Sequence, residues 1–359
     1  MKKILTIVGA RPQFIKAAAV SRAIQESFSD RLTEILVHTG QHFDHNMSEV
    51  FFEELGIPAP RHNLSISGGT HGAMTGRMLV AIEEVMLQER PDWVLIYGDT
   101  NSTLAGALSA SKLHIPIAHV EAGLRSFNNR MPEEINRIVA DRVSTLLLCP
   151  TDTAVDNLAA EGIRRGVANV GDVMFDVSLY FRDLAARQSN ALTTLGLTPG
   201  GYVLATCHRA ENTDDPARLA QIVGGLTAIG RTVPVVLPLH PRTRQILSAA
   251  GLMERLHNIR VTDPLSFLDM IALEKSARAI VTDSGGVQKE AYFFQVPCIT
   301  MRDETEWTET VSLGWNKLVG ADAQRIATAF EQARPGTMDA APYGDGRAAT
   351  KIVDLILTQ

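Results

Sequence analysis

The chain has 359 residues and a net charge of −6, with 45% hydrophobic and 21% charged residues. This composition is typical of a globular protein and excludes a disordered or fibrous chain. At about 100–200 residues per domain, the length predicts two domains. The acidic balance lacks the basic field of a general nucleic-acid-binding protein, so no nucleic acid is expected as a partner.

The sequence indicates a cytoplasmic protein without integral membrane association. No stretch approaches the ~20 apolar residues that a membrane span needs. The first apolar run ends at Arg11, which favours a core strand over a signal peptide. Cys149, Cys207 and Cys298 are far apart and form no CxxC pair, so neither a disulfide framework nor a zinc site is expected.

Short apolar runs alternate with amphipathic segments along the whole chain. Most of the runs do not alternate with polar residues, which is typical of parallel strands covered on both faces. The expected strands are Ile4–Val8, Glu34–His38, Trp93–Tyr97, Ile117–Val120, Leu146–Cys149, Ala168–Val170, Tyr202–Thr206, Val233–Leu239, Ile259–Val261, Ala279–Thr282 and Pro297–Thr300. The expected helices are Phe14–Glu26, Met47–Leu55, Gly76–Arg90, Ser102–Leu113, Glu134–Val143, Thr151–Glu161, Val173–Arg187, Pro216–Ile229, Pro241–Ala250, Ser266–Lys275 and Val287–Phe293. This alternation predicts an α/β chain with doubly wound sheets.

We expect two Rossmann-like domains, residues 1–170 and 171–345. A new strand–helix series begins after the glycine-rich Thr198–Gly201. The tail 346–359 is amphipathic and is expected to pack back on the first domain. Two such domains that face each other would form a cleft at the carboxyl ends of their strands, where open α/β sheets bind ligands.

The turn after the first strand is a candidate anion-binding site. Gly9-Ala10-Arg11-Pro12 leads into a helix that carries Lys16, so backbone N–H groups and two cations could meet an anion. The segment is neither GxGxxG nor GxxxxGK[ST], which excludes the usual NAD and ATP motifs. An ordinary strand–helix turn with a solvated lysine is the alternative.

Three carboxylates recur at the predicted ligand edge of the first sheet or in the loops above it. Asp99 and Glu121 each follow a strand, and Glu133 opens a helix after Pro132. A carboxylate in such a place can act as a base. Two simpler interpretations remain: Asp99 or Asn101 caps a helix, and Glu133 forms a surface ion pair with Arg137 at i,i+4.

The second half of the chain carries two further candidate segments. His208-Arg209-Ala210-Glu211-Asn212 ends a strand, and His240 follows the next strand in a weaker version of the same pattern. Histidine titrates near neutrality and arginine binds phosphate through a planar fork. A structural histidine is the alternative.

Asp283-Ser284-Gly285-Gly286 lies between a strand and a helix. The glycines let the backbone approach a diphosphate, Ser284 can donate another hydrogen bond, and Glu290 is placed to bind ribose hydroxyls. A glycine turn with an N-cap serine is the alternative. No spacing suggests a metal site or a Ser–His–Asp triad.

Together these segments resemble the non-hydrolysing UDP-N-acetylglucosamine 2-epimerases along nearly the whole chain. The segments that carry the resemblance are Gly9–Pro12, Gly98–Thr100, His119–Arg125, Pro132–Arg137, His208–Asn212, Asp283–Gly286 and Met301–Asp303. The resemblance implies a GT-B-like pair of domains, a homodimer, and inversion at C-2 of a UDP-linked 2-acetamido sugar without a cofactor.

The chain also departs from the usual family pattern. Ser126–Met131 is shorter than the usual segment, and Glu304–Glu309 stands where Thr-Glu-Arg-Pro-Glu is common; Gly40–Asp44 and Gly68–Gly72 differ too. These variants resemble the branch that converts UDP-2,3-diacetamido-2,3-dideoxy-D-glucuronate to the D-mannuronate epimer for lipopolysaccharide O-antigen and other surface polysaccharides. A UDP-N-acetylglucosamine 2-epimerase, a hydrolysing epimerase, a GT-B glycosyltransferase and a non-catalytic UDP-sugar sensor are the alternatives.

The family mechanism is anti elimination of UDP to a glycal, followed by re-addition. The resemblance implies that Asp99, Glu121, Glu133 and His208 are catalytic, without deciding which carboxylate acts on which face. Arg130, in the variant segment beside Glu133, is the expected partner of the glucuronate carboxylate. The full set of expected substrate-binding residues is Arg11, Lys16, Arg125, Arg130, Arg137, Arg209, Glu211, Asn212, His240, Ser284, Gly285, Gly286, Glu290 and Arg302.

Overall fold

The structure, a computed structural model, describes residues 1–41, 56–338 and 341–359. The chain divides into two compact units. Unit 1 comprises Met1–Val177 and Ala341–Gln359, and unit 2 comprises Ser178–Ala340. The division falls inside helix α7 (Val173–Gln188). Among the described residues, no helix has both the length and the apolar character to cross a membrane.

Unit 1 is built on a parallel sheet with the order β3-β2-β1-β4-β5-β6-β7. Its strands are β1 (Lys2–Val8), β2 (Leu32–His38), β3 (His62–Asn63), β4 (Trp93–Tyr97), β5 (Ile117–Val120), β6 (Leu146–Cys149) and β7 (Val167–Asn169). The chain reverses its direction of progress across the sheet between β1 and β4. In open α/β sheets, ligands bind at the carboxyl ends of the strands beside such a reversal.

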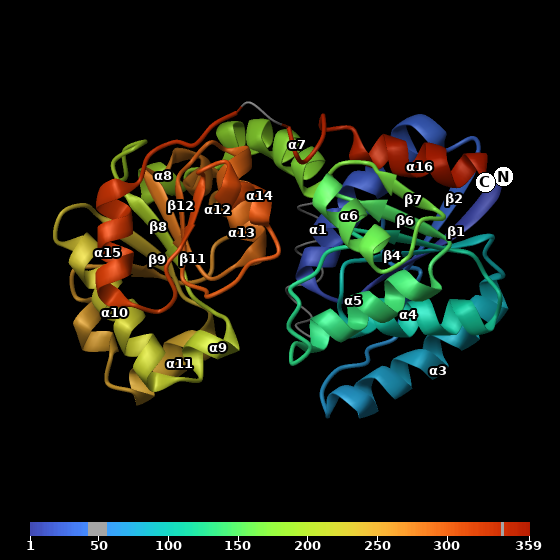
Figure 1. The fold of residues 1–359 in the computed structure, drawn as a ribbon, viewed down its shortest axis with the longest axis horizontal. Coiled ribbons are helices and arrows are strands. Elements are labelled where there is room, and N and C mark those ends of the chain that lie inside the picture. The colour runs from blue at the N-terminus through green and yellow to red at the C-terminus, as the bar shows by residue number, and fades with distance from the viewer. Residues whose placement is uncertain (42–55, 339–340) are drawn as a thin grey trace. The chain divides into compact units, whose positions relative to one another are not determined.

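Helices cover both faces of this sheet (Figure 1). They are α1 (Arg11–Ala23), continued by a π-helical turn (Ile24–Phe28), α3 (His71–Glu89), α4 (Asn101–Lys112), α5 (Pro132–Val143), α6 (Asp152–Ala160) and α16 (Ala348–Thr358). Helices α3, α4 and α5 lie side by side on one face and share a core with alternate residues of the central strands, such as Leu5, Ile7, Val94 and Ile96.

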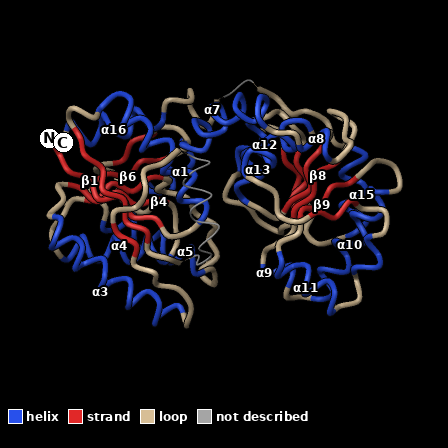
Figure 2. The backbone as a smooth tube through the Cα atoms, turned by 180° about the vertical axis from the view of Figure 1, so that it is seen from behind, coloured by secondary structure: helices blue, strands red, loops and turns tan. Residues whose placement is uncertain are grey.

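The C-terminal helix α16 packs beside α1 on the other face. The Asp176 carboxylate accepts hydrogen bonds from the backbone N–H groups of Ala348 and Ala349, at 3.1 and 2.8 Å, and so caps the start of α16. Burial raises the pKa of Asp176 to about 6. Both chain ends therefore lie on unit 1, next to each other (Figures 1 and 2).

Unit 2 repeats this architecture with the strand order β10-β9-β8-β11-β12-β13, also parallel. Its strands are β8 (Val203–Thr206), β9 (Val235–Pro238), β10 (Arg260–Thr262), β11 (Ala279–Thr282), β12 (Cys298–Thr300) and β13 (Asn316–Leu318). Its helices are α8 (Ala191–Thr194), α9 (Ala210–Thr213), α10 (Pro216–Gly230), α11 (Pro241–Ala249), a 3₁₀ turn (Met253–Leu256), α12 (Phe267–Ser276), α13 (Gly285–Phe293), α14 (Thr308–Ser312) and α15 (Ala323–Gln332). Residues of α10, α11 and α15 form the core on one face, and residues of α8, α12 and α13 form it on the other.

The structure confirms the predicted α/β class with two doubly wound parallel sheets. The sequence does not predict β3 and β13, because two or three residues are too few to show a strand pattern. Helix α15 is not predicted either, although Ile326 and Phe330 are buried one turn apart and form a helical stripe. The helix expected over Met47–Leu55 lies outside the described residues.

Candidate active site

The turn between β1 and α1 is fixed by Gln13. Its side-chain oxygen accepts the backbone N–H groups of Gly9 and Ala10, at 2.9 and 3.1 Å, and its nitrogen donates to the Tyr97 carbonyl at the end of β4. Arg11 and Pro12 therefore begin α1 at the carboxyl edge of the sheet, as the sequence predicts. One turn further along α1, Lys16 is 9% exposed.

Lys16 forms a buried ion pair with Glu121, which directly follows β5. The two side chains are only 11% and 8% exposed. Glu121 has a left-handed backbone conformation, with φ of 68°, an unfavourable one for a residue with a side chain. Its N–H donates to the Leu148 carbonyl at 3.1 Å, which helps hold this conformation. Two chemically active side chains are thus brought together from positions 105 residues apart.

Asp99 forms an ion pair with Arg137 on α5. The second terminal nitrogen of Arg137 binds Glu134 at 2.7 Å, and the side chain of the neighbouring Asn136 donates to the Asp99 carbonyl at 2.8 Å. The alternative in which Asp99 or Asn101 caps the helix is wrong, because the Thr100 hydroxyl accepts the Thr103 N–H and caps α4. This leaves the Asp99 carboxylate bound to Arg137 at the carboxyl edge of the sheet.

Gly98 lies close to the Lys16–Glu121 pair. A Cβ atom at Gly98 would lie 3.4 Å from both Glu121 Oε1 and Lys16 Nζ, so a side chain at this position would crowd the pair. Gly98 has φ of 59°, a conformation that glycine adopts at little cost. The structure therefore gathers Lys16, Asp99, Glu121 and Arg137 at one edge of unit 1.

Arg130 lies in the segment that leads into α5, Glu133 is the second residue of that helix, and both residues are exposed. The buried Glu134 carboxylate orders this segment by accepting hydrogen bonds from the Ser126 N–H, the Ser126 hydroxyl and the Phe127 N–H. The Arg130 N–H donates to the Asn128 side chain at 3.1 Å. Glu134 is thus a structural site residue that the sequence analysis did not assign, although the Pro132–Arg137 segment contained it.

Arg125 is buried inside unit 1, where two carboxylates bind its guanidinium. It is 5% exposed, binds both oxygens of Glu161 at 2.6 and 2.9 Å, and binds Asp141 at 2.7 Å. Although burial lowers the pKa of this guanidinium, the two carboxylates outweigh it and raise the pKa above its usual value. Its role as a substrate ligand remains a prediction.

In unit 2, Asp283 organises the turn that follows β8. Its fully buried carboxylate accepts the backbone N–H groups of His208 and Arg209 at 3.0 Å and the side-chain amide of Asn212 at 3.2 Å. The His208 ring lies 3.4 Å away and is half-exposed. Asp283 belongs to a predicted motif, but the sequence assigns it no role. Its position after β11, the neighbour of β8, is the signal that could have indicated that it orders the turn after β8.

The start of α13 combines a cap with exposed backbone groups. The Ser284 hydroxyl accepts the Val287 N–H, so the N-cap serine that the sequence offered only as the alternative is present, and Gly285 and Gly286 form the first helical positions. A Cβ atom at Gly285 would lie 3.9 Å from an Arg209 terminal nitrogen. The backbone N–H groups of a helix start and a nearby guanidinium form an arrangement suited to a phosphate.

Arg302 is a buried cation of unit 2 that lies between two glutamates. It is 1% exposed, binds Glu306 at 3.1 Å and approaches Glu211 at 3.6 Å. Burial raises the pKa of Glu306, but the Arg302 guanidinium more than offsets this and the pKa lies below its usual value. Trp307 follows, with the Lys289 ammonium 3.7 Å from its ring centroid. Glu306 and Trp307 belong to the variant segment, but the sequence analysis assigned them no role.

His240 caps α11 through its ring nitrogen, which accepts the Arg242 N–H at 3.3 Å. It lies after β9, as expected, but no hydrogen bond among the described residues connects it to Asp283. Glu290, on α13, is 8% exposed. Among the described residues, no group of His, Cys, Asp and Glu side chains has the arrangement of a metal site.

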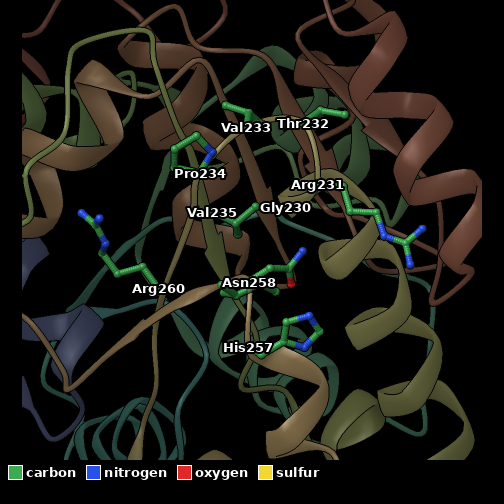
Figure 3. A pocket seen from close by; sticks show the side chains of 10 residues that line it. Gly230, Arg231, Thr232, Val233, Pro234, Val235, His257, Asn258 and Arg260 are labelled. Carbon is green, nitrogen blue, oxygen red and sulfur yellow. The ribbon is translucent and has the colours of Figure 1, made fainter.

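A hollow of about 530 Å³ in unit 2 lies at the opposite edge of the sheet (Figure 3). Its lining residues, 230–235 and 257–260, directly precede or begin β9 and β10. They therefore lie at the amino ends of the strands, whereas His208, Asp283 and Ser284 lie at the carboxyl ends. This hollow is not the predicted ligand edge.

The buried Lys16–Glu121 pair gives a stability prediction. Lys16→Met leaves Glu121 buried without its cation and should destabilise unit 1 by about 3–5 kcal/mol. The double variant Lys16→Met/Glu121→Gln should recover more than half of that loss, because no unpaired charge is then buried. Hydrogen exchange of the β1 and β5 amides in urea measures the free energy of unfolding of unit 1.

Arg31→Met is the control, because the Arg31–Asp30 pair is exposed and should contribute less than about 0.5 kcal/mol. A double variant no more stable than Lys16→Met would contradict the interpretation.

Comparison with known proteins identifies the family. A model of the UDP-N-acetylglucosamine 2-epimerase family matches residues 24–357. The chain is 57% identical over 361 aligned residues to the UDP-2,3-diacetamido-2,3-dideoxy-D-glucuronate 2-epimerase of Pseudomonas aeruginosa, with 99% of both chains covered. It is 42% identical over 363 residues to a UDP-N-acetylglucosamine 2-epimerase of Methanocaldococcus jannaschii, covering 99% of this chain and 98% of the other.

Solved structures agree with the sequence relatives. The M. jannaschii UDP-GlcNAc 2-epimerase in complex with UDP-GlcNAc and UDP has a TM-score of 0.92 at 41% identity, with both chains fully covered. The Neisseria meningitidis UDP-GlcNAc 2-epimerase bound to UDP-GlcNAc has a TM-score of 0.89 at 29% identity, covering 99% of this chain and 100% of the other. The chain belongs to the UDP-N-acetylglucosamine 2-epimerase family, a family of isomerases.

Proposed function

We propose that this enzyme inverts C-2 of a UDP-linked 2-acetamido sugar by anti elimination of UDP and re-addition. The observation that carries the proposal is the pair of carboxylates, Asp99 and Glu121, each bound to a cation at the carboxyl edge of the unit 1 sheet. An enzyme that moves a proton at carbon needs such groups in fixed positions.

The chemistry explains why both carboxylates and a diphosphate site are needed. The C-2 proton is not adjacent to a carbonyl and is barely acidic. When the bond from C-1 to the UDP oxygen breaks, positive charge develops at C-1 and the C-2 proton becomes acidic. A carboxylate takes that proton, and UDP and a glycal with a C-1–C-2 double bond are formed. Return of a proton to the opposite face of C-2 and of the UDP oxygen to C-1 completes the inversion.

We assign the leaving diphosphate to Ser284, Gly285, Gly286 and His208 of unit 2. The helix start and the nearby Arg209 offer donors to developing negative charge, and each preorganised donor can contribute about 3 kcal/mol to a rate. Glu290 is assigned to the ribose hydroxyls.

The sugar is assigned to unit 1. Lys16, Asp99, Glu121, Glu133 and Arg137 surround it in this proposal. Four of these five residues are gathered by the ion pairs of unit 1, and Glu133 lies at the start of α5, which carries Arg137. The ion pairs with Lys16 and Arg137 hold two of the three carboxylates in defined orientations.

The substrate proposed is UDP-2,3-diacetamido-2,3-dideoxy-D-glucuronate, and the product its D-mannuronate epimer. The support is the 57% identity to an enzyme of that name, against 42% to a UDP-N-acetylglucosamine 2-epimerase. Such a product serves lipopolysaccharide O-antigen or other surface polysaccharide synthesis. We place the reaction in the cytoplasm; the three free, buried cysteines are compatible with a reducing compartment.

We further propose a homodimer in which a second copy covers the outer face of α3. Val80 and Leu87 on this face are 63% and 56% exposed, and no neighbouring atom lies within 4 Å of a Cβ atom built at Gly72 or Gly76. Light scattering should give twice the 39.0 kDa chain mass, and Val80→Glu/Leu87→Glu should halve it. A monomeric wild-type protein would contradict this proposal.

One incubation in deuterated water tests the reaction. Proton NMR should show the C-2 epimer with deuterium at C-2, formed from the UDP-sugar alone without an acceptor. Glu121→Gln and Asp99→Asn should each lower the rate by about 10²–10⁴-fold, as expected for the loss of a group that transfers a proton.

Each alternative gives a different spectrum. Release of free sugar and UDP would indicate a hydrolysing epimerase, and dependence on an acceptor would indicate a glycosyltransferase. Retention of every ring proton would indicate a sensor. Parallel incubation with UDP-N-acetylglucosamine decides between the two epimerase substrates.

Arg130 gives a prediction about substrate choice. Its guanidinium is exposed, and no ion pair to it occurs among the described residues. If it binds the glucuronate carboxylate, Arg130→Ala should raise KM for the uronate about 10–100-fold, the value of a charged hydrogen bond of about 1.5–3 kcal/mol. KM for a neutral UDP-sugar should change less than about threefold.

Arg165→Ala, which removes another exposed arginine of unit 1, is the matched control and should change neither value. Equal losses for the charged and neutral substrates would remove the assignment of Arg130.

A further inference from the structure

His119 lies at the centre of a buried polar cluster that the proposed mechanism does not use. It is the third residue of β5 and is 0% exposed. Its Nδ1 lies 2.8 Å from Asp141 Oδ1 on α5, and its Nε2 lies 2.7 Å from the carbonyl oxygen of Gly98 at the end of β4. The imidazole therefore joins three elements beneath the turn that carries Asp99.

Both ring nitrogens of His119 face hydrogen-bond acceptors. The Gly98 carbonyl can only accept, so Nε2 carries a proton. The other partner, Asp141, also receives the Gly123 N–H at 3.2 Å and the Arg125 guanidinium at 2.7 Å. These donors favour a carboxylate over a carboxylic acid at Asp141. Two acceptors on one ring require the imidazolium form, since a neutral imidazole donates through one nitrogen only.

The electrostatic surroundings agree with a carboxylate at Asp141. Burial raises the pKa of Asp141, but the His119 and Arg125 contacts outweigh burial and leave the pKa below its usual value. Burial also raises the pKa of Cys149 on β6 to about 12, so this thiol near Asp141 stays neutral.

The remaining charges around the cluster are balanced. Glu161, which forms two hydrogen bonds with Arg125, completes a set of two cations and two carboxylates with His119 and Asp141. Helix α4 also packs against β5, and its one charged residue, Lys112, is exposed. No unbalanced charge among these groups therefore opposes a buried imidazolium.

We propose that His119 is a positioning residue which, as a permanent imidazolium, holds the Gly98–Asp99 turn in place for the C-2 chemistry. Both backbone groups of Gly98 form hydrogen bonds with residues of β5. Its N–H donates to the Val120 carbonyl at 3.0 Å, and its carbonyl accepts from the His119 ring. The same turn lies close to Glu121 and Lys16 and directly precedes Asp99. Its left-handed conformation is thus fixed by two hydrogen bonds and leaves room for the Lys16–Glu121 pair.

The kinetic part of this inference rests on the proposed function, whereas the protonation part does not. A misplacement of about 1 Å in a group that transfers a proton can cost about 100-fold in rate. Loss of the His119 contacts should therefore act on the proton-transfer step. Binding of UDP should be spared, because the proposed diphosphate residues of unit 2 are untouched.

The protonation state is tested first, by long-range ¹H–¹⁵N NMR of protein labelled with ¹⁵N-histidine. The His119 signals are identified by their loss in His119→Gln. Both nitrogens of His119 should show protonated shifts from pH 6 to pH 9, and the signals of the exposed His257 serve as the internal reference. In Asp141→Asn, which keeps the imidazole but removes its counter-charge, one nitrogen should lose its proton below pH 8. An unprotonated nitrogen in the wild-type protein at pH 8 overturns the proposal.

Kinetics test the positioning role. His119→Gln keeps an amide donor but can satisfy only one of the two acceptors, and kcat should fall about 100-fold while KM for the UDP-sugar and Kd for UDP change less than about threefold. His257→Gln should leave all three values unchanged. A kcat within twofold of wild type overturns the positioning role, and so does an equal loss in UDP binding. If the wild-type protein epimerises no UDP-sugar, the proposed function fails, and the NMR result still decides the state of His119.

Discussion

The constraint on which the carboxyl edge of the unit 1 sheet depends is the pairing of two carboxylates with cations from other elements. Glu121 after β5 binds Lys16 of α1, and Asp99 after β4 binds Arg137 of α5. A carboxylate with little exposure is costly unless a partner offsets its desolvation. The two pairs therefore permit acidic groups at a mostly buried sheet edge, and they also fix the orientation of α1 and α5 relative to that edge.

Unit 2 solves a related problem with backbone groups. The Asp283 carboxylate is fully buried and receives two backbone N–H groups of the His208–Arg209 turn. It follows β11, the strand beside β8, so a single side chain fixes the neighbouring loop. The next residues, Ser284 and Gly285, begin α13 and leave its first N–H groups for a ligand. The Asp283 carboxylate holds the His208–Arg209 turn in place. The proposed diphosphate contacts come from His208, Ser284 and the first N–H groups of α13.

The proposed reaction connects these two arrangements. Departure of a diphosphate is aided by N–H groups and cations, whereas removal of a proton from carbon needs a base. Unit 2 offers the first set and unit 1 the second. The cluster of His119, Asp141, Arg125 and Glu161 lies on the strand that precedes Glu121 and on the elements beside it, and it is neutral with His119 in the proposed imidazolium form. The same pairing of carboxylates with cations thus occurs in the residues assigned to the substrate and in the residues that position them.

The sequence by itself determined the fold class and most of the residues that gather at the two sheet edges. Parallel strands buried on both faces leave continuous apolar runs, and polar residues after those runs must lie at one edge. The sequence also determined the family, because the segments that resemble the UDP-N-acetylglucosamine 2-epimerases follow one another along the chain in the same order as in those enzymes.

Only the tertiary structure decided which of these residues pair. The helix spacing suggested Glu133 as the partner of Arg137, whereas the structure shows Arg137 bound to Glu134 and Asp99. The sequence likewise did not indicate that Arg125, an expected substrate ligand, forms ion pairs with Asp141 and Glu161 inside unit 1. The physical reason is that an ion pair depends on distances of a few ångströms between distant elements, and apolar periodicity contains no information on those distances.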